Sequence, residues 1–225
     1  MAESKQQQQM YKAVETNTVV ISEKKAYLIT KRTIDIILSL IGIILLLPVL
    51  LLIAIFIKLE DKKGSIIFRQ ERVGIHGKPF YMYKFRSMVS NAEELLKDLI
   101  EQNEASGPLF KMKEDPRVTR IGRFLRKTSL DELPQLINVI KGEMSLVGPR
   151  PALPKEVETY TSFERQRLEV TPGLTCFWQV EGRSNIGFEE QIQLDLKYIE
   201  KRSFKTDIFL IIRTIKVLFG SNGAF

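Results

Sequence analysis

The sequence IDIILSLIGIILLLPVLLLIAIFI, residues 34–57, is almost wholly apolar and decides how the chain is organised. A helix of this length would extend about 36 Å at about 1.5 Å per residue, enough to cross a hydrocarbon core of roughly 30 Å. Asp35, Ser39, Gly42 and Pro48 interrupt the apolar run. The stretch predicts a helix inserted in a membrane, and the alternative is a buried helix of a soluble protein.

Basic residues lie on both sides of this stretch. They are Lys24, Lys25, Lys31 and Arg32 before it and Lys58, Lys62 and Lys63 after it. Because positive charge is retained in the cytoplasm, both ends are expected there. Pro48 disfavours helical geometry at Leu47, so we expect a re-entrant helix hairpin that enters, bends at Leu47–Pro48 and returns to the same face. An ordinary single span is the alternative, because Glu60 and Asp61 dilute the second basic cluster.

A second informative stretch is SLDELPQ, residues 129–135. Ser129 followed by Glu132 matches a capping box, which predicts that a helix begins here and continues to Gly142. The positive end of that helix would favour an ionised Asp131. An ionised aspartate can act as a nucleophile or bind a metal ion. The simpler interpretation is that Asp131 and Glu132 are ordinary helix-start residues.

The charge of the chain indicates anionic partners. Its formal net charge is +7 and its pI is about 9.4, which fits nucleic acid, an acidic membrane surface or phosphorylated substrates. A membrane segment argues against nucleic acid. With Cys176 as the single cysteine and His76 as the single histidine, the chain cannot form an internal disulfide, a thiolate cluster or a multi-histidine metal site. His76 lies between two glycines and is predicted to be a turn residue.

Several cations lie where they could hold a phosphate near Asp131. Four arginines recur every three residues, at positions 117, 120, 123 and 126, and Arg126 nearly adjoins the carboxylates. A solvated or lipid-facing surface is the alternative for this stripe. Lys84 and Arg86 follow a predicted strand, and Arg150 lies between two prolines that limit the motion of its backbone.

The remaining patterns predict an α+β fold that is mostly helical. Residues 65–70 and 80–85 have the pattern of a β-hairpin, a helix follows Ser90 and stops before Gly107, and residues 178–180 suggest a short strand. Amphipathic helices are expected from Phe188 and over 208–219, the second either lying on the membrane or packing on the core. We predict a flexible polar tail over 1–27, the membrane helix over 28–60 and a small cytoplasmic catalytic domain over 61–225.

Taken in order, these motifs resemble the bacterial sugar transferases, the monotopic phosphoglycosyl transferases. The resemblance covers roughly residues 28–220 and rests on five features: the apolar run with its proline, KFRSM at 84–88, SLDELPQ, GPRP at 148–151, and the PG…QV…GR pattern from Pro172 to Arg183. It implies an enzyme that transfers a sugar phosphate from a nucleotide-sugar, usually a UDP-sugar, to polyprenyl phosphate. The products are a polyprenyl-diphosphate sugar and a nucleoside monophosphate. This is the first membrane step of exopolysaccharide, O-antigen or glycoconjugate synthesis.

The resemblance also implies roles for individual residues. Asp131 would be the covalent nucleophile, with Glu132 as its partner and both as Mg²⁺ ligands. The substrate-binding residues would be Lys84, Arg86, Arg126, Arg150 and Arg183. Many members of the family have an arginine at the position of Thr171 and a glycine at the position of Cys176. These departures put the nucleotide or phosphate contacts near Thr171 in doubt.

The resemblance places the protein at the bacterial inner membrane, with the catalytic domain on the cytoplasmic face. Its expected partners are the nucleotide-sugar, polyprenyl phosphate and the lipid bilayer, and a homodimer is left open. The rival hypothesis is a non-enzymatic, membrane-attached basic scaffold that binds anionic lipids or an assembly partner.

Overall fold

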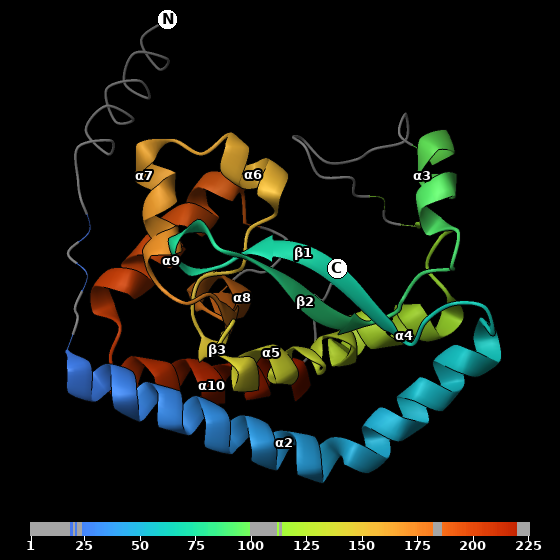
Figure 1. The fold of residues 1–225 in the computed structure, drawn as a ribbon, viewed down its shortest axis with the longest axis horizontal. Coiled ribbons are helices and arrows are strands. Elements are labelled where there is room, and N and C mark those ends of the chain that lie inside the picture. Colours follow the sequence, from blue (N-terminus) through green and yellow to red (C-terminus); the bar gives the residue numbers. More distant parts are fainter. Residues whose placement is uncertain are drawn as a thin grey trace, which may run out of the picture.

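A computed structural model describes residues 19, 21, 24–99, 112, 114–181 and 186–219. Most of these residues are helical, and two small two-stranded sheets complete the fold (Figure 1). The predicted fold class, α+β and mostly helical, is confirmed. Most of the predicted tail, the end of the helix predicted to stop before Gly107, and Arg183 lie outside the described residues.

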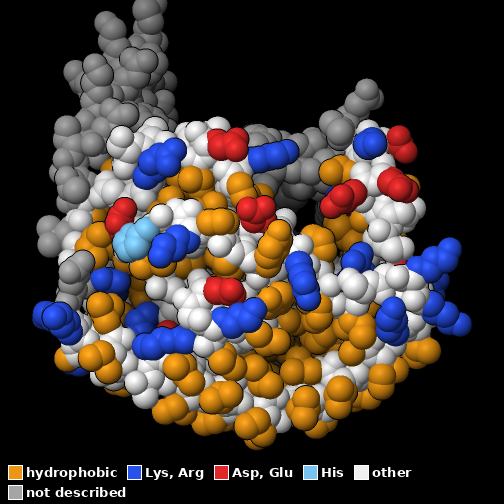
Figure 2. All heavy atoms as spheres, viewed as in Figure 1, with side chains coloured by type: hydrophobic (Ala, Val, Ile, Leu, Met, Phe, Trp, Pro, Cys, Tyr) orange, Lys and Arg blue, Asp and Glu red, His pale blue; other side chains and the backbone are white. Residues whose placement is uncertain are grey.

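The apolar stretch forms one long helix, α2 (Lys25–Glu60). It begins before residue 28, runs through Pro48 without a break and is bent along its length (Figure 1), as helices containing proline are. Most of its apolar side chains are exposed; Ile44 and Leu45, for example, are 68% and 71% exposed. This exposure contradicts the alternative of a buried helix in a soluble protein. The lower part of the surface in Figure 2, where α2 lies, is accordingly apolar.

Both ends of α2 are hydrogen-bonded to the domain above it. Near the N-terminal end, the guanidinium of Arg32 donates to two backbone carbonyls in the last turn of α5 (Gln135–Lys141), at 2.5 and 2.7 Å. At the C-terminal end, the carboxylate of Glu60 accepts from the first two N–H groups of α4 (Arg120–Thr128), at 2.7 and 2.9 Å. Asp35, buried on the inner face, accepts from the backbone N–H of Leu146 in the strand β3 (Ser145–Val147), which follows α5. Both ends of the helix are therefore attached to the rest of the fold.

The predicted hairpin is confirmed. Strands β1 (Ile67–Val73) and β2 (Pro79–Phe85) pair antiparallel, and the short turn η1 (Ile75–Gly77) connects them. His76 lies in this turn, as predicted. A second sheet pairs β3 (Ser145–Val147) in parallel with β4 (Gly173–Thr175).

Two glycines, Gly148 in the loop after β3 and Gly173 at the start of β4, allow a close backbone approach. A Cβ atom on Gly173 would lie 2.1 Å from the backbone nitrogen of Gly148, so no larger residue fits there. This contact holds the GPRP loop next to β4.

The remaining helices surround the two sheets. They are α3 (Ala92–Leu99), η3 (Leu130–Glu132), α6 (Pro154–Glu158), α7 (Ser162–Arg165), η4 (Gln166–Glu169), α8 (Phe177–Glu181), α9 (Phe188–Lys201) and α10 (Phe204–Phe219). The largest buried cluster joins α8, α9 and α10 to β3 and to Cys176, which follows β4. The two C-terminal amphipathic helices are therefore confirmed.

Residues 178–180 form helix α8, so the strand predicted there is wrong. Phe177, Trp178 and Val180 are all buried, and a helical turn directs the three side chains into one core between α9 and α10. In a strand, adjacent residues would point to opposite faces. Aromatic and β-branched residues indicated a strand by propensity, and packing outweighed it.

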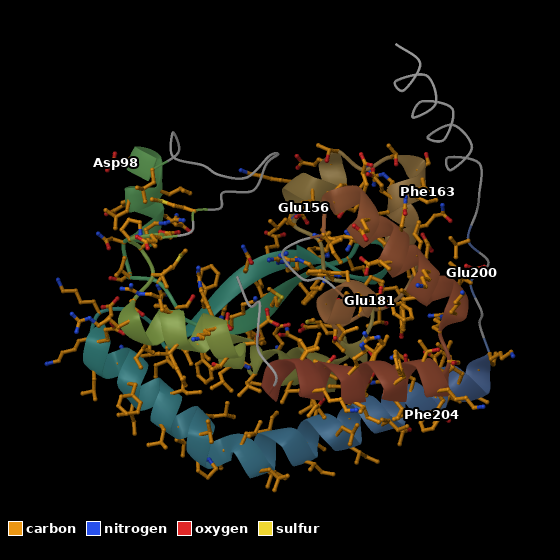
Figure 3. All side chains as sticks on the ribbon, turned by 180° about the vertical axis from the view of Figure 1, so that it is seen from behind. Asp98, Glu156, Phe163, Glu181, Glu200 and Phe204 are labelled. Atoms are coloured by element: carbon orange, nitrogen blue, oxygen red, sulfur yellow. The ribbon has the colours of Figure 1, made fainter. Side chains whose placement is uncertain are left out.

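Helix α10 combines the two roles that its sequence left open. Leu210 is fully buried in the core, whereas Phe209, Ile212 and Ile215 are about half exposed. The helix runs along the N-terminal half of α2, near the labelled Phe204 (Figure 3), and Lys31 of α2 forms an ion pair with its Asp207 at 3.1 Å. The exposed side chains of α10 thus extend the apolar surface of α2.

Candidate active site

The Asp131–Glu132 pair lies on a short turn between two helices. Ser129 adopts a left-handed conformation (φ 56°, ψ 18°) and ends α4, its N–H donating to the carbonyls of Leu125 and Arg126. Residues 130–132 then form the 3-10 turn η3, and α5 begins only at Gln135. The predicted capping box is wrong, because Ser129 makes no side-chain cap and lacks the extended backbone of an N-cap residue.

The Glu132 carboxylate instead binds a cation from the hairpin. Lys84, near the end of β2, donates from Nζ to Glu132 Oε1 at 2.6 Å. Desolvation raises the pKa of Glu132, but Lys84, Arg150 and Arg72 lower it, and the net shift is downward. Glu132 is therefore an ionised carboxylate that holds the lysine beside Asp131.

Asp131 is 8% exposed and differs electrostatically from its neighbour. Burial raises its pKa from 3.8 to about 6, although the charges of Lys84 and Arg126 oppose the rise, and Glu132 adds to it. The sequence predicted that a helix end would lower the pKa of Asp131. Because η3 is only a short turn, that effect is small and desolvation outweighs it. At neutral pH Asp131 is still mostly ionised, as a nucleophile must be.

Four of the five predicted substrate-binding residues line the same cavity as Asp131, with a volume of about 1310 Å³. Arg126 donates from Nε to Ser87 Oγ at 2.9 Å, which directs its guanidinium toward the hairpin. Arg150 lies over the ring of Trp178, 5.8 Å from its centroid. Arg86 is bound to Ser65, at 2.7 and 2.8 Å, so its donors are partly engaged. Arg183 lies outside the described residues.

The cavity has a polar part and an apolar part. The carboxylates and cations form the polar part, near the ends of β2 and α4. The apolar part is lined by residues of α2, α5, β3 and α10, among them Leu38, Leu136, Leu146, Ile211 and Ile215. This arrangement suits a ligand with a charged head and an apolar tail that reaches from the membrane surface.

Two buried arginines hold the loop that carries Arg150. Arg72 donates to the carbonyl of Pro151 at 2.9 Å, and Arg167 donates to the carbonyl of Arg150 at 3.2 Å. Arg167 also pairs with Asp195, which is fully buried on α9. None of these three residues was predicted from the sequence. Asp195 could have indicated them, because it is a carboxylate on the apolar face of a predicted helix. A charge buried on such a face needs an oppositely charged partner.

The two departures from the family pattern lie away from the Asp131 cavity. Thr171 lines a separate cavity of about 390 Å³ that also contains His76 and Asp35. Cys176 is fully buried, and burial raises the pKa of its thiol well above the ordinary range. Neither side chain is among those that line the larger cavity, although Thr175, next to Cys176, does line it.

The site meets the usual requirements of a magnesium ion shared with substrate. Within the described part of the chain, no cluster of three or more His, Cys, Asp or Glu residues could form a metal site of its own. Mg²⁺ is commonly bound by one or two carboxylates together with substrate phosphates. Asp131 and Glu132 provide two adjacent carboxylates. The donor set fits the ion only when a phosphorylated substrate is also bound.

The chain belongs to the bacterial sugar transferase family, whose model matches residues 26–221. The resemblance predicted from the motifs is therefore confirmed. Together with the exposed apolar helix α2, this membership indicates a membrane protein.

Curated relatives align over most of the chain. It is 46% identical over 204 residues to the galactosyl transferase CpsE of Streptococcus agalactiae, covering 89% of this chain and 44% of that protein. It is 42% identical over 210 residues to the undecaprenyl-phosphate galactose phosphotransferase of Salmonella typhimurium, covering 90% of this chain and 43% of that protein. The exopolysaccharide production protein ExoY of Sinorhizobium fredii is 38% identical over 201 residues, with 88% of both chains covered. The chain thus spans less than half the length of the first two relatives.

Proposed function

We propose that the protein transfers a sugar phosphate from a nucleotide-sugar, a UDP-sugar as the family resemblance implies, to polyprenyl phosphate. The observation that carries this proposal is the position of Asp131 among Lys84, Arg126 and Glu132, in a cavity whose other part is apolar and adjoins α2. The relative named undecaprenyl-phosphate galactose phosphotransferase supports the same reaction class. The product would enter exopolysaccharide or glycoconjugate synthesis.

The reaction proceeds in two displacements at one phosphorus atom. A carboxylate oxygen of Asp131 attacks the β-phosphorus of the donor, and the bond from that phosphorus to the bridging oxygen breaks. The nucleoside monophosphate leaves with the bridging oxygen. An oxygen of polyprenyl phosphate then attacks the phosphorus, the bond to Asp131 breaks, and the carboxylate is restored. No proton needs to be removed from either nucleophile, so the lack of a nearby histidine is no obstacle.

The residues around Asp131 stabilise charge on the phosphates. Lys84 and Arg126 lower the pKa of Asp131 and so keep more of it ionised before the attack. The same cations, with Arg150, lie where charge would gather on the non-bridging oxygens, and such preorganised charges account for most of the catalysis of phosphoryl transfer. Glu132 or Asp131, together with the donor phosphates, would hold a Mg²⁺ ion, which would supply further charge neutralisation.

The membrane topology is part of the proposal. With both ends of α2 hydrogen-bonded to one domain, the helix enters the inner membrane and returns to the cytoplasmic face. Single cysteines placed at Lys25 and Lys63 would test this, because both positions are exposed and the native Cys176 is buried. Labelling of either position by a membrane-impermeant reagent from the periplasmic side would refute the re-entrant topology.

A mass measurement tests the covalent step. The protein incubated with nucleotide-sugar and no lipid acceptor should gain the mass of one phospho-sugar, located on Asp131 by peptide mapping. Asp131→Asn should show neither adduct nor turnover, whereas Asp115→Asn, a change at a carboxylate outside the cavity, should show both. Full turnover by wild-type protein with no detectable adduct would count against the intermediate. Release of nucleoside monophosphate with both substrates present would separate the enzyme from a mere scaffold.

A further inference from the structure

Helix α4 divides its cations between two faces. At about 100° per residue, the side chains of Arg120, Arg123, Phe124 and Lys127 fall on one face of the helix. All four are exposed. Arg126 lies off this face, is half-buried and binds Ser87 within the candidate site. The regularly spaced arginines therefore lie on two different surfaces of α4. Only the surface with Arg126 belongs to the candidate active site.

The exposed face, which we call the α4 basic face, consists of Arg120, Arg123, Phe124 and Lys127. Its aromatic ring is 55% exposed between the three cations. Within the described part of the chain, the side chains of these cations form no hydrogen bond or ion pair, and α4 contains no acidic residue. No side-chain contact among the described residues thus accounts for these three neighbouring positive charges.

The α4 basic face lies at the boundary of the apolar surface. The carboxylate of Glu60 binds the first N–H groups of α4, so the helix begins where α2 ends. Just before that point, Phe56 and Leu59 of α2 are 50% and 65% exposed. Lys62 and Lys63, also exposed, follow Asp61, the residue that caps the end of α2. Figure 2 shows Lys and Arg side chains gathered over α4 and the end of α2, above the apolar lower surface.

We propose that the α4 basic face binds the headgroups of anionic phospholipids. The inference rests on the proposed insertion of α2, which places α4 at headgroup depth. Positive side chains are attracted to anionic headgroups, while an aromatic ring between them inserts at the apolar boundary. An acidic protein would pair with these cations but would leave the adjoining apolar side chains of Phe56 and Leu59 exposed to water. A lipid surface satisfies both.

The lipids carried with the protein provide a direct test. Wild-type protein and two variants would be extracted from membranes in polymer nanodiscs, and the ratio of phosphatidylglycerol to phosphatidylethanolamine measured by mass spectrometry. Wild-type discs should be enriched in phosphatidylglycerol over the bulk membrane. Arg120→Gln/Arg123→Gln should reduce this enrichment, by up to roughly fivefold for each cation in full contact. The control Lys155→Gln/Arg165→Gln, on α6 and α7 away from α2 (Figure 1), should retain it.

Three results would overturn the inference: no enrichment around wild-type protein, full enrichment around Arg120→Gln/Arg123→Gln, or an equal loss in the control. The thermal unfolding midpoint of the first variant should match that of wild type, because both side chains are exposed, and this measurement excludes misfolding as the cause of a loss. Fractionation distinguishes the two proposals. A protein that remains in the membrane without lipid selection refutes only the α4 basic face, whereas a protein in the soluble fraction refutes the insertion of α2 as well.

Discussion

Replacing the proposed nucleophile should stabilise the fold. Burial raises the pKa of Asp131 from 3.8 to about 6, so the ionised form is less favourable in the folded protein than in the unfolded chain. At about 1.4 kcal/mol per pH unit, this rise corresponds to about 3 kcal/mol of lost stability once the group is ionised. Asp131→Asn has no charge to bury and should recover up to that amount, while losing activity.

The sign of the effect depends on pH in a defined way. Between pH 3.8 and about 6 the folded protein binds more protons at Asp131 than the unfolded chain, so wild-type stability falls as pH rises. The advantage of Asp131→Asn should therefore be absent below pH 3.8 and complete above about pH 6. Asp115→Asn serves as a matched control of opposite sign, because Arg117 lowers the pKa of that carboxyl, and the variant should be less stable at neutral pH.

Unfolding of the purified proteins in detergent, followed by circular dichroism over this pH range, would measure both differences. An Asp131→Asn variant no more stable than wild type above pH 6 would refute the desolvation argument. An equal gain at every pH would also refute it, since the gain would then have a cause other than charge.

Three further outcomes are expected. Turnover at limiting donor should fall as the pH drops below about 6, where Asp131 becomes protonated, and Lys84→Met should move the midpoint of this profile upward because it removes a charge that favours ionisation. Arg167→Met should destabilise the fold by about 3–5 kcal/mol in thermal unfolding, since it leaves Asp195 buried without its cation, and adding Asp195→Leu should restore much of the loss. Glu60→Ala should cost about 1 kcal/mol in the same assay, because the first N–H groups of α4 lose their acceptor, whereas Glu60→Gln should cost less.

Local patterns predicted the elements that depend on nearby residues. The hairpin, the long apolar helix and the two C-terminal helices follow from hydrophobic periodicity and turn residues, and the structure confirms them. The capping box at Ser129 failed because the same residue ends the preceding helix, and a single residue cannot adopt both conformations. The strand expected at residues 178–180 failed because three neighbouring apolar residues are buried together.

The electrostatics of the site could not be predicted from local sequence. Glu132 meets Lys84, 48 residues away in the chain, only because the hairpin folds against η3. The high pKa of Asp131 arises from burial, which no short motif specifies. Likewise, Arg167 and Asp195 support the Arg150 loop through contacts between separate helices and loops.

The bonds between α2 and the domain connect folding to membrane insertion. Arg32 supplies the donors for the last carbonyls of α5, and Glu60 supplies the acceptor for the first N–H groups of α4. Two helices that flank Asp131 are thus completed by residues of the apolar helix. In a chain whose α2 does not yet contact the domain, these helix ends lack part of their hydrogen-bond partners, so the helices that flank Asp131 would be completed only when α2 packs against them.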